Sequence, residues 1–383
     1  MGGAKRLWME EEERRWGTID KCVCEACLDT PDLWRILTAK IREGDCDYCE
    51  QEGLPFLSVH DVQAQLYQAI FTHYADPQHA GTPWIDGQWA VNQIDIEDVM
   101  SELDFLPVDA LAKDIASADR TQLWIKAAHG SWAGVQDDEL MLYSWATFVR
   151  TVKHQTRFHF QRVVAERLED EIPVSEMLGV VAENLANLLS TVAVGTRIYR
   201  ARHLSQDELA RIDASLMGPP PKEHAGAGRM NPAGIPYFYS AFDPHTAVVE
   251  IGDPSEDSKA LAVAGFRVDR ILNVVDLSTL PAVPSALAID RQRERVTAKF
   301  LRRFVESITQ KVQKDGREHV DYVPSQVVCE FLAQAHVMPN DQTIDGIIYP
   351  SAVSPDGINL VIFPRGRWFE HEKFPGITYL GPA

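Results

Sequence analysis

Apolar residues recur at intervals of three and four positions through residues 58–190, and this spacing is typical of helices that bury one face. It is clearest in the stretches VQAQLYQAIFTHY, EDVMSELDFL and VSEMLGVVAENLANLLSTV. Between them lie GTPWIDGQWAV and AHGSWAGVQDDE, whose Gly, Pro and Trp residues favour loops. The pattern therefore predicts a mostly helical N-terminal region.

The pattern changes after residue 195, where short β-rich runs are bounded by Gly, Pro and Asp. These runs are TRIYRAR, PYFYSAF, KALAVAGFRV, ILNVVDLS, DGIIYPSA and GINLVIF. Helices are expected between them at 243–252, 289–312 and about 321–336. The first of these helices has Asp243 as its cap and Pro244 in its first turn. The fold class is therefore α+β, with a mostly α-helical N-terminal domain, a small zinc module and a C-terminal mixed-sheet domain.

Five of the six cysteines lie within residues 22–49, and four of them form two CxxC pairs with an 18-residue spacer. Such spacing is typical of a zinc site. The expected ligands are Cys24, Cys27, Cys46 and Cys49. Four thiolates complete a closed tetrahedral site, so this zinc would stabilise the fold and take no part in catalysis. The alternatives are disulfides, which a cytosolic location disfavours, or free thiols. Cys22 could replace one ligand, and Cys329 is expected to be a buried hydrophobe.

Length and composition set the wider limits. The 383 residues, 45% of them hydrophobic, are enough for two domains with separate cores. We expect a charged segment at 1–20, the zinc module at 21–54, a helical domain at 55–190 and the mixed-sheet domain at 191–383. A net charge of −19 argues against nucleic-acid binding. With no apolar run of membrane-spanning length and no secretory signal, a cytoplasmic protein without membrane contact is expected.

The segment from Gly228 to Glu250, GRMNPAGIPYFYSAFDPHTAVVE, holds the main candidate site. Arg229 lies in a Gly-containing loop, where its guanidinium could clamp a phosphate or simply form a salt bridge. Tyr239 ends an aromatic run and could stack on a ligand ring or belong to the core. Glu250 falls in the last turn of its helix, against the macrodipole, which suggests a function although a surface position is the simpler alternative.

Two further residues extend this site. Arg200 lies in a strand of an apolar sheet, where a cation should have a partner, either Glu250 or a phosphate. Ser351 follows a strand and precedes a Pro-Asp-Gly turn, without a His and Asp arranged as a triad. We therefore expect Ser351 to bond a phosphate or ribose and not to act as a nucleophile.

These candidate residues, in the order in which they follow one another along the chain, resemble the motifs of the RES family. Its members are NAD-degrading toxins of bacterial toxin–antitoxin pairs, and their fold is related to that of ADP-ribosyltransferases. The resemblance covers about residues 190–365. It departs from the family at Met230, where Trp is usual. The matching positions are Tyr199, Arg200, Gly228, Arg229, Asn231, Gly234, Tyr239, Glu250, Gln326, Asp345, Gly346, Tyr349 and Ser351.

The resemblance implies a catalytic core of Arg229, Tyr239 and Glu250, with Ser351 assisting. It also implies NAD+ contacts from residues of the entry strand and the Gly-Arg loop: Tyr199, Arg200, Gly228 and Asn231. The expected reaction releases nicotinamide and passes ADP-ribose to water or phosphate, so that NAD depletion makes the protein a toxin or defence effector. Transfer of ADP-ribose to a macromolecule and an inactive nucleotide-binding module are the alternatives.

The N-terminal half resembles the helical region, grouped with HEPN domains, that is fused in front of RES domains. Arg150 and His154 share a helix face, as in HEPN ribonucleases, but their spacing is shorter than usual. A packed helix face with a satisfied His is therefore preferred to ribonuclease activity. Expected partners are an antitoxin protein or further copies of the chain.

Overall fold

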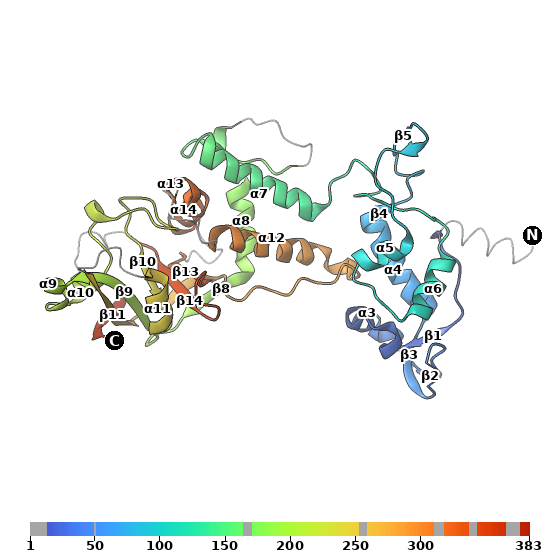
Figure 1. Cartoon of the computed structure of the whole chain (residues 1–383), viewed down its shortest axis with the longest axis horizontal. Helices are drawn as coiled ribbons and strands as arrows, with labels where there is room; N and C mark the ends of the chain where they lie inside the picture. Colours follow the sequence, from blue (N-terminus) through green and yellow to red (C-terminus); the bar gives the residue numbers. More distant parts are fainter. Residues whose placement is uncertain are drawn as a thin grey trace, which may run out of the picture. The chain divides into compact units, whose positions relative to one another are not determined.

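The computed structural model describes residues 14–49, 51–163, 171–252, 259–309, 318–336, 343–364 and 376–383. Most of the expected charged N-terminal segment, residues 1–13, and the end of the predicted 289–312 helix lie outside the described residues. The chain divides into two compact units. The first comprises Met1–Leu140 and Ala282–Lys299, and the second comprises Met141–Pro281 and Phe300–Ala383 (Figure 1).

The first unit contains the predicted N-terminal helices and a small antiparallel sheet of order β1-β3-β2. Its core surrounds Leu66 of α4, Val99 of α5, Ile115 of α6 and the indole of Trp124, all of them fully buried. Its helices are α2 (Glu25–Leu28), α3 (Pro31–Ile36), α4 (Val59–His73), α5 (Ile96–Glu102) and α6 (Asp109–Ala118). Its strands are β1 (Cys22–Cys24), β2 (Arg42–Gly44), β3 (Leu54–Ser58), β4 (Tyr74–Ala75), β5 (Trp84–Ile85), β6 (Gln88–Trp89) and β7 (Ile125–Lys126).

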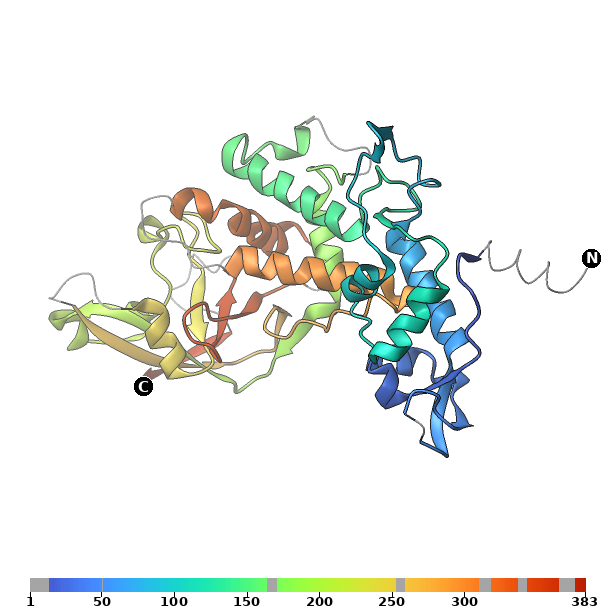
Figure 2. The same cartoon turned by 45° about the vertical axis from the view of Figure 1, so that its right-hand side comes forward.

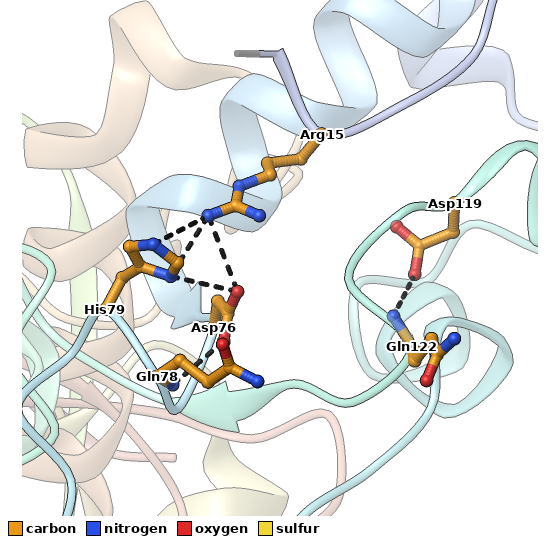
Figure 3. Close-up of polar contacts among 6 residues, drawn as sticks. All are labelled: Arg15, Asp76, Gln78, His79, Asp119 and Gln122. Atoms are coloured by element: carbon orange, nitrogen blue, oxygen red, sulfur yellow. Dashed lines mark hydrogen bonds and ion pairs between the residues drawn. The ribbon is translucent and has the colours of Figure 1, made fainter. Parts of the chain in front are cut away.

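Polar contacts fix two turns of this unit (Figure 3). The Arg15 guanidinium reaches His79 at 3.0 Å, and His79 in turn contacts the Asp76 carboxylate at 3.0 Å. Asp119 accepts the backbone N–H of Gln122 at 3.2 Å. Burial raises the pKa of Asp119, although its hydrogen bonds oppose that shift. Asp119 also accepts hydrogen bonds from the Tyr67 hydroxyl and the Trp124 indole, so its contacts belong to the scaffold of the first unit.

The second unit has a helical layer whose core is aromatic. Trp145 packs against Phe148, Phe300 and Phe304 with ring centroids 5.2–6.3 Å apart. Residues 141–190 are predicted to belong to the helical N-terminal domain, yet Trp145 and Phe148 lie in the core of the second unit. The helices of this layer are α7 (Asp137–His154), α8 (Met177–Leu185), α12 (Gln292–Thr309), α13 (Glu318–Asp321) and α14 (Val323–Glu330), which continues as a π-helical turn, Phe331–Ala335.

The predicted mixed sheet is present and has, within the described residues, eight strands in the order β15-β11-β9-β10-β14-β13-β12-β8. Neighbouring strands are antiparallel except β12 and β13. The bounds are β8 (Leu189–Val192), β9 (Arg197–Ser205), β10 (Phe238–Ala241), β11 (Lys259–Val268), β12 (Leu272–Asp276), β13 (Gly346–Pro350), β14 (Ile358–Ile362) and β15 (Ile377–Pro382). The prediction of helix through residues 189–192 is wrong, because these residues form β8 and pair with β12.

One face of the sheet forms its own core, since Ile198, Phe238, Phe266 and Leu360 from four different strands belong to a single buried cluster. The sheet therefore curls around these side chains. The other face supports the helical layer, with short α11 (Pro244–Ile251) lying against β9 and β10 (Figures 1 and 2). Two further short helices, α9 (Gln206–Leu209) and α10 (Ala214–Met217), follow β9.

Candidate active site

A cleft opens where strands β9 and β10 stop pairing. All residues of both strands are described, and the two strands share one register pair, Ala241 with Tyr199. Beyond that pair lies a cleft of about 390 Å³, within the range of about 300–1,000 Å³ that is typical of small-molecule sites. The residues lining it are Tyr199, Arg200, Ala201, Arg202, His203, Tyr239, Ser240, Ala247, Glu250, Ile251, Tyr349 and Asn359.

A row of cross-strand neighbours forms one wall of the cleft. Tyr199 on β9, Ala241 on β10, Asn359 on β14 and Tyr349 on β13 are successive register partners. Side chains alternate between the two faces of a strand, and register partners on adjacent strands point to the same face. These four side chains therefore share a face of the sheet. Helix α11 covers this face through Ala247, which packs on Ala241 in a small cluster. The row thus places two tyrosines and one amide beneath a helix.

Helix α11 carries Glu250 to the cleft and has the signals that the sequence predicted. Asp243 caps it by accepting the Thr246 N–H at 2.8 Å, Pro244 occupies the first turn, and Gly252 ends it with φ of 70°. Hydrogen bonding to the Thr246 side chain, and after it to the Thr246 backbone N–H, lowers the pKa of Asp243. Glu250 is in the last turn, where its charge opposes the helix dipole.

The Glu250 carboxylate is held through one of its two oxygens. Ser351 Oγ donates to Oε1 at 2.6 Å, and Asn359 Nδ2 donates to the same oxygen at 2.6 Å. Glu250 Oε2 has no hydrogen-bond partner among the described residues. Asn359 was not predicted as a site residue, although an amide within the aliphatic run INLVI was a usable signal. One carboxylate oxygen is therefore fixed and the other is left for a ligand.

Ser351 serves Glu250 and its own loop. Its Oγ accepts the N–H groups of Val353 at 3.2 Å and Ser354 at 3.0 Å. A hydroxyl has one proton and two lone pairs, so both acceptor positions are occupied and the proton goes to Glu250. The full use of the Ser351 hydroxyl in these hydrogen bonds agrees with the expectation that Ser351 is not a nucleophile. In place of the expected bond to a phosphate or ribose, the structure has a bond to the carboxylate.

Arg200 brings a cation to the point where the strands separate. Its Nη1 donates to the Tyr239 carbonyl at 3.1 Å, and its guanidinium lies 5.1 Å from the Phe238 ring centroid. Its Nε is buried without a partner, and no carboxylate among the described residues pairs with it. Burial, and to a lesser extent the charge of Arg202, lowers the pKa of Arg200 to about 9. The guanidinium is thus charged at neutral pH and is not paired with Glu250, one of its two predicted partners; the other is a phosphate.

The loop containing the Gly-Arg motif is fastened to Tyr239. The Tyr239 hydroxyl accepts the Met230 N–H at 3.0 Å and donates to Asn231 Oδ1 at 2.8 Å. The buried Asn231 amide then donates to three carbonyls at 2.9–3.0 Å, those of Gly226, Pro232 and Ile235. The Tyr239 hydroxyl and Asn231 are thus engaged within the protein. Met230, where the family usually has Trp, is fully buried in the core.

Gly228 is required by this loop. A Cβ atom at this position would lie 2.4 Å from Asn231 Oδ1 and 2.8 Å from the Tyr239 hydroxyl oxygen. Gln326, part of the family pattern, holds the same loop by donating to the carbonyls of Gly228 at 2.8 Å and Asn231 at 3.0 Å. Gly228 and Asn231, expected to contact NAD+, have this structural role in the described residues.

Arg229 is not among the residues that line the cleft, and its side chain has no hydrogen-bond partner among the described residues. Its charge nevertheless reaches the tyrosines at the site. Burial raises the pKa values of Tyr239 and Tyr349, and the Arg229 guanidinium opposes both shifts. Of the eight predicted catalytic and binding residues, four line one cleft, Ser351 bonds Glu250, and the other three belong to the supporting loop.

These features define an α+β domain whose cleft holds one carboxylate, aromatic side chains and a guanidinium that has no counter-ion among the described residues. Such a guanidinium is chemically suited to an anionic group. The RES domain model matches residues 197–378, and the model of HEPN/RES N-terminal domain 1 matches residues 39–166. Residues 197–378 therefore form a RES domain, as the sequence predicted, and residues 39–166 match its HEPN-type companion domain. The family supports an NAD-related, toxin-type function. No curated protein matches the chain.

The first unit contains a possible metal centre of four cysteines. The sulfur atoms of Cys24, Cys27, Cys46 and Cys49 all lie within 4.8 Å of one another. The Cys24 N–H donates to Cys46 Sγ at 3.3 Å, as is usual for a ligating thiolate. Cys22 is outside this cluster, and Cys329 is fully buried, as expected. The donor set fits a metal that prefers four sulfur ligands.

Two other expectations concern helices. Arg150 and His154 are both exposed on α7, so the expectation of a packed face with a satisfied His is wrong. Over the described ranges, every helix is too short or too polar to cross a bilayer.

Proposed function

We propose that this chain degrades NAD+ by breaking the bond between nicotinamide and ribose. The observation that carries the proposal is Arg200, a buried guanidinium in the same cleft as the Glu250 carboxylate. Among the described residues the guanidinium has no counter-ion and one oxygen of the carboxylate has no partner. A buried charge is costly unless it is paired. A pyrophosphate is the anion that best matches the planar guanidinium, because it can accept two parallel hydrogen bonds.

The chemistry follows from the position of Glu250. When the bond between ribose C1′ and the nicotinamide nitrogen breaks, the electron pair moves to the ring nitrogen and neutralises its positive charge. Nicotinamide therefore leaves without a general acid, and the sugar acquires oxocarbenium character, as in glycoside hydrolysis. Glu250 Oε2 stabilises this charge and accepts a ribose hydroxyl. An oxygen of water or phosphate then bonds to C1′, and with water as acceptor a proton is released.

The remaining cleft residues position the dinucleotide. Tyr199 and Tyr349 flank the middle of the row and present ring surfaces for the nicotinamide or its ribose. Tyr239 acts mainly through its hydroxyl, which holds the Arg229 loop. Arg229, whose charge acts on the buried hydroxyls of Tyr239 and Tyr349, supplies additional positive charge for the phosphates.

Incubation of the purified protein with NAD+ tests this proposal. We expect free nicotinamide by chromatography, no labelled protein when the adenylate carries the label, and loss of release in Glu250→Gln, which keeps the side-chain size. Label transferred to protein would instead indicate an ADP-ribosyltransferase, the second candidate, because the same cation would then be captured by a macromolecule. Absence of both products would leave a nucleotide-binding module and overturn the proposal.

The four-cysteine cluster is proposed to hold a structural zinc ion. The cluster supplies four sulfur ligands and leaves no position for water, so the metal would stabilise the fold of the first unit and would not activate a substrate.

In a cell, we propose that NAD+ loss makes the chain a cytoplasmic toxin or defence effector, restrained by an antitoxin protein or by homo-oligomerisation. Light scattering tests the last point, because a monomeric mass at micromolar concentration would remove self-association as the restraint. Expression in cells tests the proposed role as a toxin or defence effector, because the wild type should arrest growth and Glu250→Gln should not.

A further inference from the structure

We propose that Asn359 is a positioning residue for catalysis, which together with Ser351 fixes the Glu250 carboxylate so that Oε2 faces the ribose. The inference rests on the proposed function and assigns a residue to it that neither the sequence motif nor the family match identifies. Its basis is the shared contact, since Asn359 Nδ2 and Ser351 Oγ both lie 2.6 Å from the same oxygen, Oε1.

The position of Asn359 is rigid. It is 3% exposed and lies on β14 between two paired strands, opposite Ala241 on β10 and Tyr349 on β13. Its neighbours along the strand, Ile358 and Leu360, are aliphatic. Asn is unfavourable in strands, and a buried amide is costly unless it is hydrogen-bonded. A residue of this type in the centre of the sheet therefore indicates a specific partner, and that partner is Glu250.

The direction of the hydrogen bonds explains why two donors are needed. Glu250 is in the last turn of α11, where the carbonyl ends of the helix disfavour a negative charge. Hydrogen bonds that donate to a carboxylate favour its charged form. Ser351 has one proton to give, and its lone pairs already accept the Val353 and Ser354 N–H groups. Asn359 supplies the second donor from the opposite element, so that Glu250 is held from a loop and a strand together.

The amide also has a polar atom to spare. Because Nδ2 donates to Glu250, Oδ1 points elsewhere, and it has no hydrogen-bond partner among the described residues. Asn359 lines the cleft, so Oδ1 is available as an acceptor for a ligand hydroxyl. The Asn359 side chain can therefore orient the Glu250 carboxylate through Nδ2 and position the ribose next to it through Oδ1.

Three variants test the inference: Asn359→Ala, Ser351→Ala and the double variant. Each single variant leaves one donor on Oε1, so we expect kcat to fall about tenfold with KM changed less than threefold. The double variant leaves none and should lose about 10³-fold, close to Glu250→Gln and more than the product of the two single losses. Asn187→Ala, an exposed amide in the same unit, is the control and should change neither constant.

A structural role for Asn359 would give a different result. It would lower the melting temperature and the amount of active protein, and the double variant would lose no more than the product of the single losses; that outcome overturns the inference. Asn359→Asp adds a second check, because it keeps the shape but brings a carboxylate to Oε1, and two carboxylates so close cannot both ionise. It should lose more activity than Asn359→Ala at neutral pH, and an equal or smaller loss contradicts the inference.

The proposed function can fail separately. If the wild type releases no nicotinamide, that function is wrong, whereas crystal structures of the same variants still decide whether Asn359 positions Glu250. We then expect Glu250 to keep its rotamer in each single variant and to leave it in the double variant. An unmoved Glu250 side chain in the double variant would show that Asn359 does not hold it.

Discussion

The Arg200 guanidinium donates to the Tyr239 backbone carbonyl over 3.1 Å, at the level where β9 and β10 no longer pair. A side chain thus takes the place of a backbone donor from the neighbouring strand. The arrangement leaves Arg200 Nε buried, with no partner in the part of the chain that the structure describes. It also keeps the two strands apart, because the guanidinium lies between them and over the Phe238 ring.

Replacement of Arg200 by Gln should separate stability from ligand binding. Removing an unpaired, desolvated charge relieves a penalty, so we expect the free energy of unfolding in denaturant to stay the same or rise by about 1 kcal/mol. The affinity for ADP-ribose should fall at least tenfold in calorimetry, because a charged hydrogen bond to phosphate is lost. Arg211→Gln, outside the cleft lining, is the control. A less stable variant with normal affinity would assign Arg200 to the scaffold.

The affinity for ADP-ribose should depend on pH above about 9. In the free protein the pKa of Arg200 is lowered to about 9, by burial first and by Arg202 second, while Tyr239 opposes the shift. A bound phosphate favours the charged form, so the pKa in the complex is higher. Below pH 9 both states are protonated and affinity is constant; above it, binding must take up a proton and affinity falls by up to about tenfold per pH unit. In Arg200→Gln this component of the pH dependence should be absent.

Gly228→Ala should disrupt the Gly-Arg loop. The added Cβ would lie 2.4 Å from Asn231 Oδ1, too close for either atom to remain in place. We expect a loss of about 1–3 kcal/mol in the free energy of unfolding, as in other overpacked sites, with loss of nicotinamide release. Gly226→Ala is the matched control, because a Cβ there meets nothing within 4 Å. Equal effects of the two substitutions would show that the close approach at Gly228 is unimportant.

Tyr239→Phe should affect stability as well as turnover. The substitution leaves the Met230 N–H and Asn231 Oδ1 without their partner, at a cost of about 1–3 kcal/mol. Thermal unfolding measures this change. Tyr237→Phe provides the control, since the Tyr237 hydroxyl has no hydrogen bond among the described residues and its loss should cost less than about 0.5 kcal/mol. A stable Tyr239→Phe protein that lacks activity would indicate a direct catalytic role.

Removal of zinc should unfold the first unit. Elemental analysis is expected to find one zinc per chain, and a strong chelator should lower the melting temperature, because metal binding and folding are coupled. Cys24→Ser should do the same, whereas Cys22→Ser, outside the cluster, should keep both zinc and stability. Purified protein without metal, or a Cys24→Ser variant as stable as the wild type, would rule out the structural zinc.

The helices and strands of this fold can largely be predicted from the sequence, whereas the contacts between distant residues mostly cannot. Asp243 and Pro244 predicted α11, and the short β-rich runs predicted six strands of the large sheet. Strand β8 was not predicted, because its residues continue a helical pattern in the sequence. These residues form a strand because they pair with β12. Asn359 was missed because its partner Glu250 is 109 positions away, and such a contact depends on strand register.

The single register pair between β9 and β10 has a thermodynamic consequence. In the described sheet this pair joins a group of three strands, β15, β11 and β9, to the remaining five. A molecule bound at that junction contacts both, so its binding energy also resists their separation. Occupied protein should then unfold at a higher temperature, and once the product has left, the same junction should be the first part of the large sheet to exchange its amide protons.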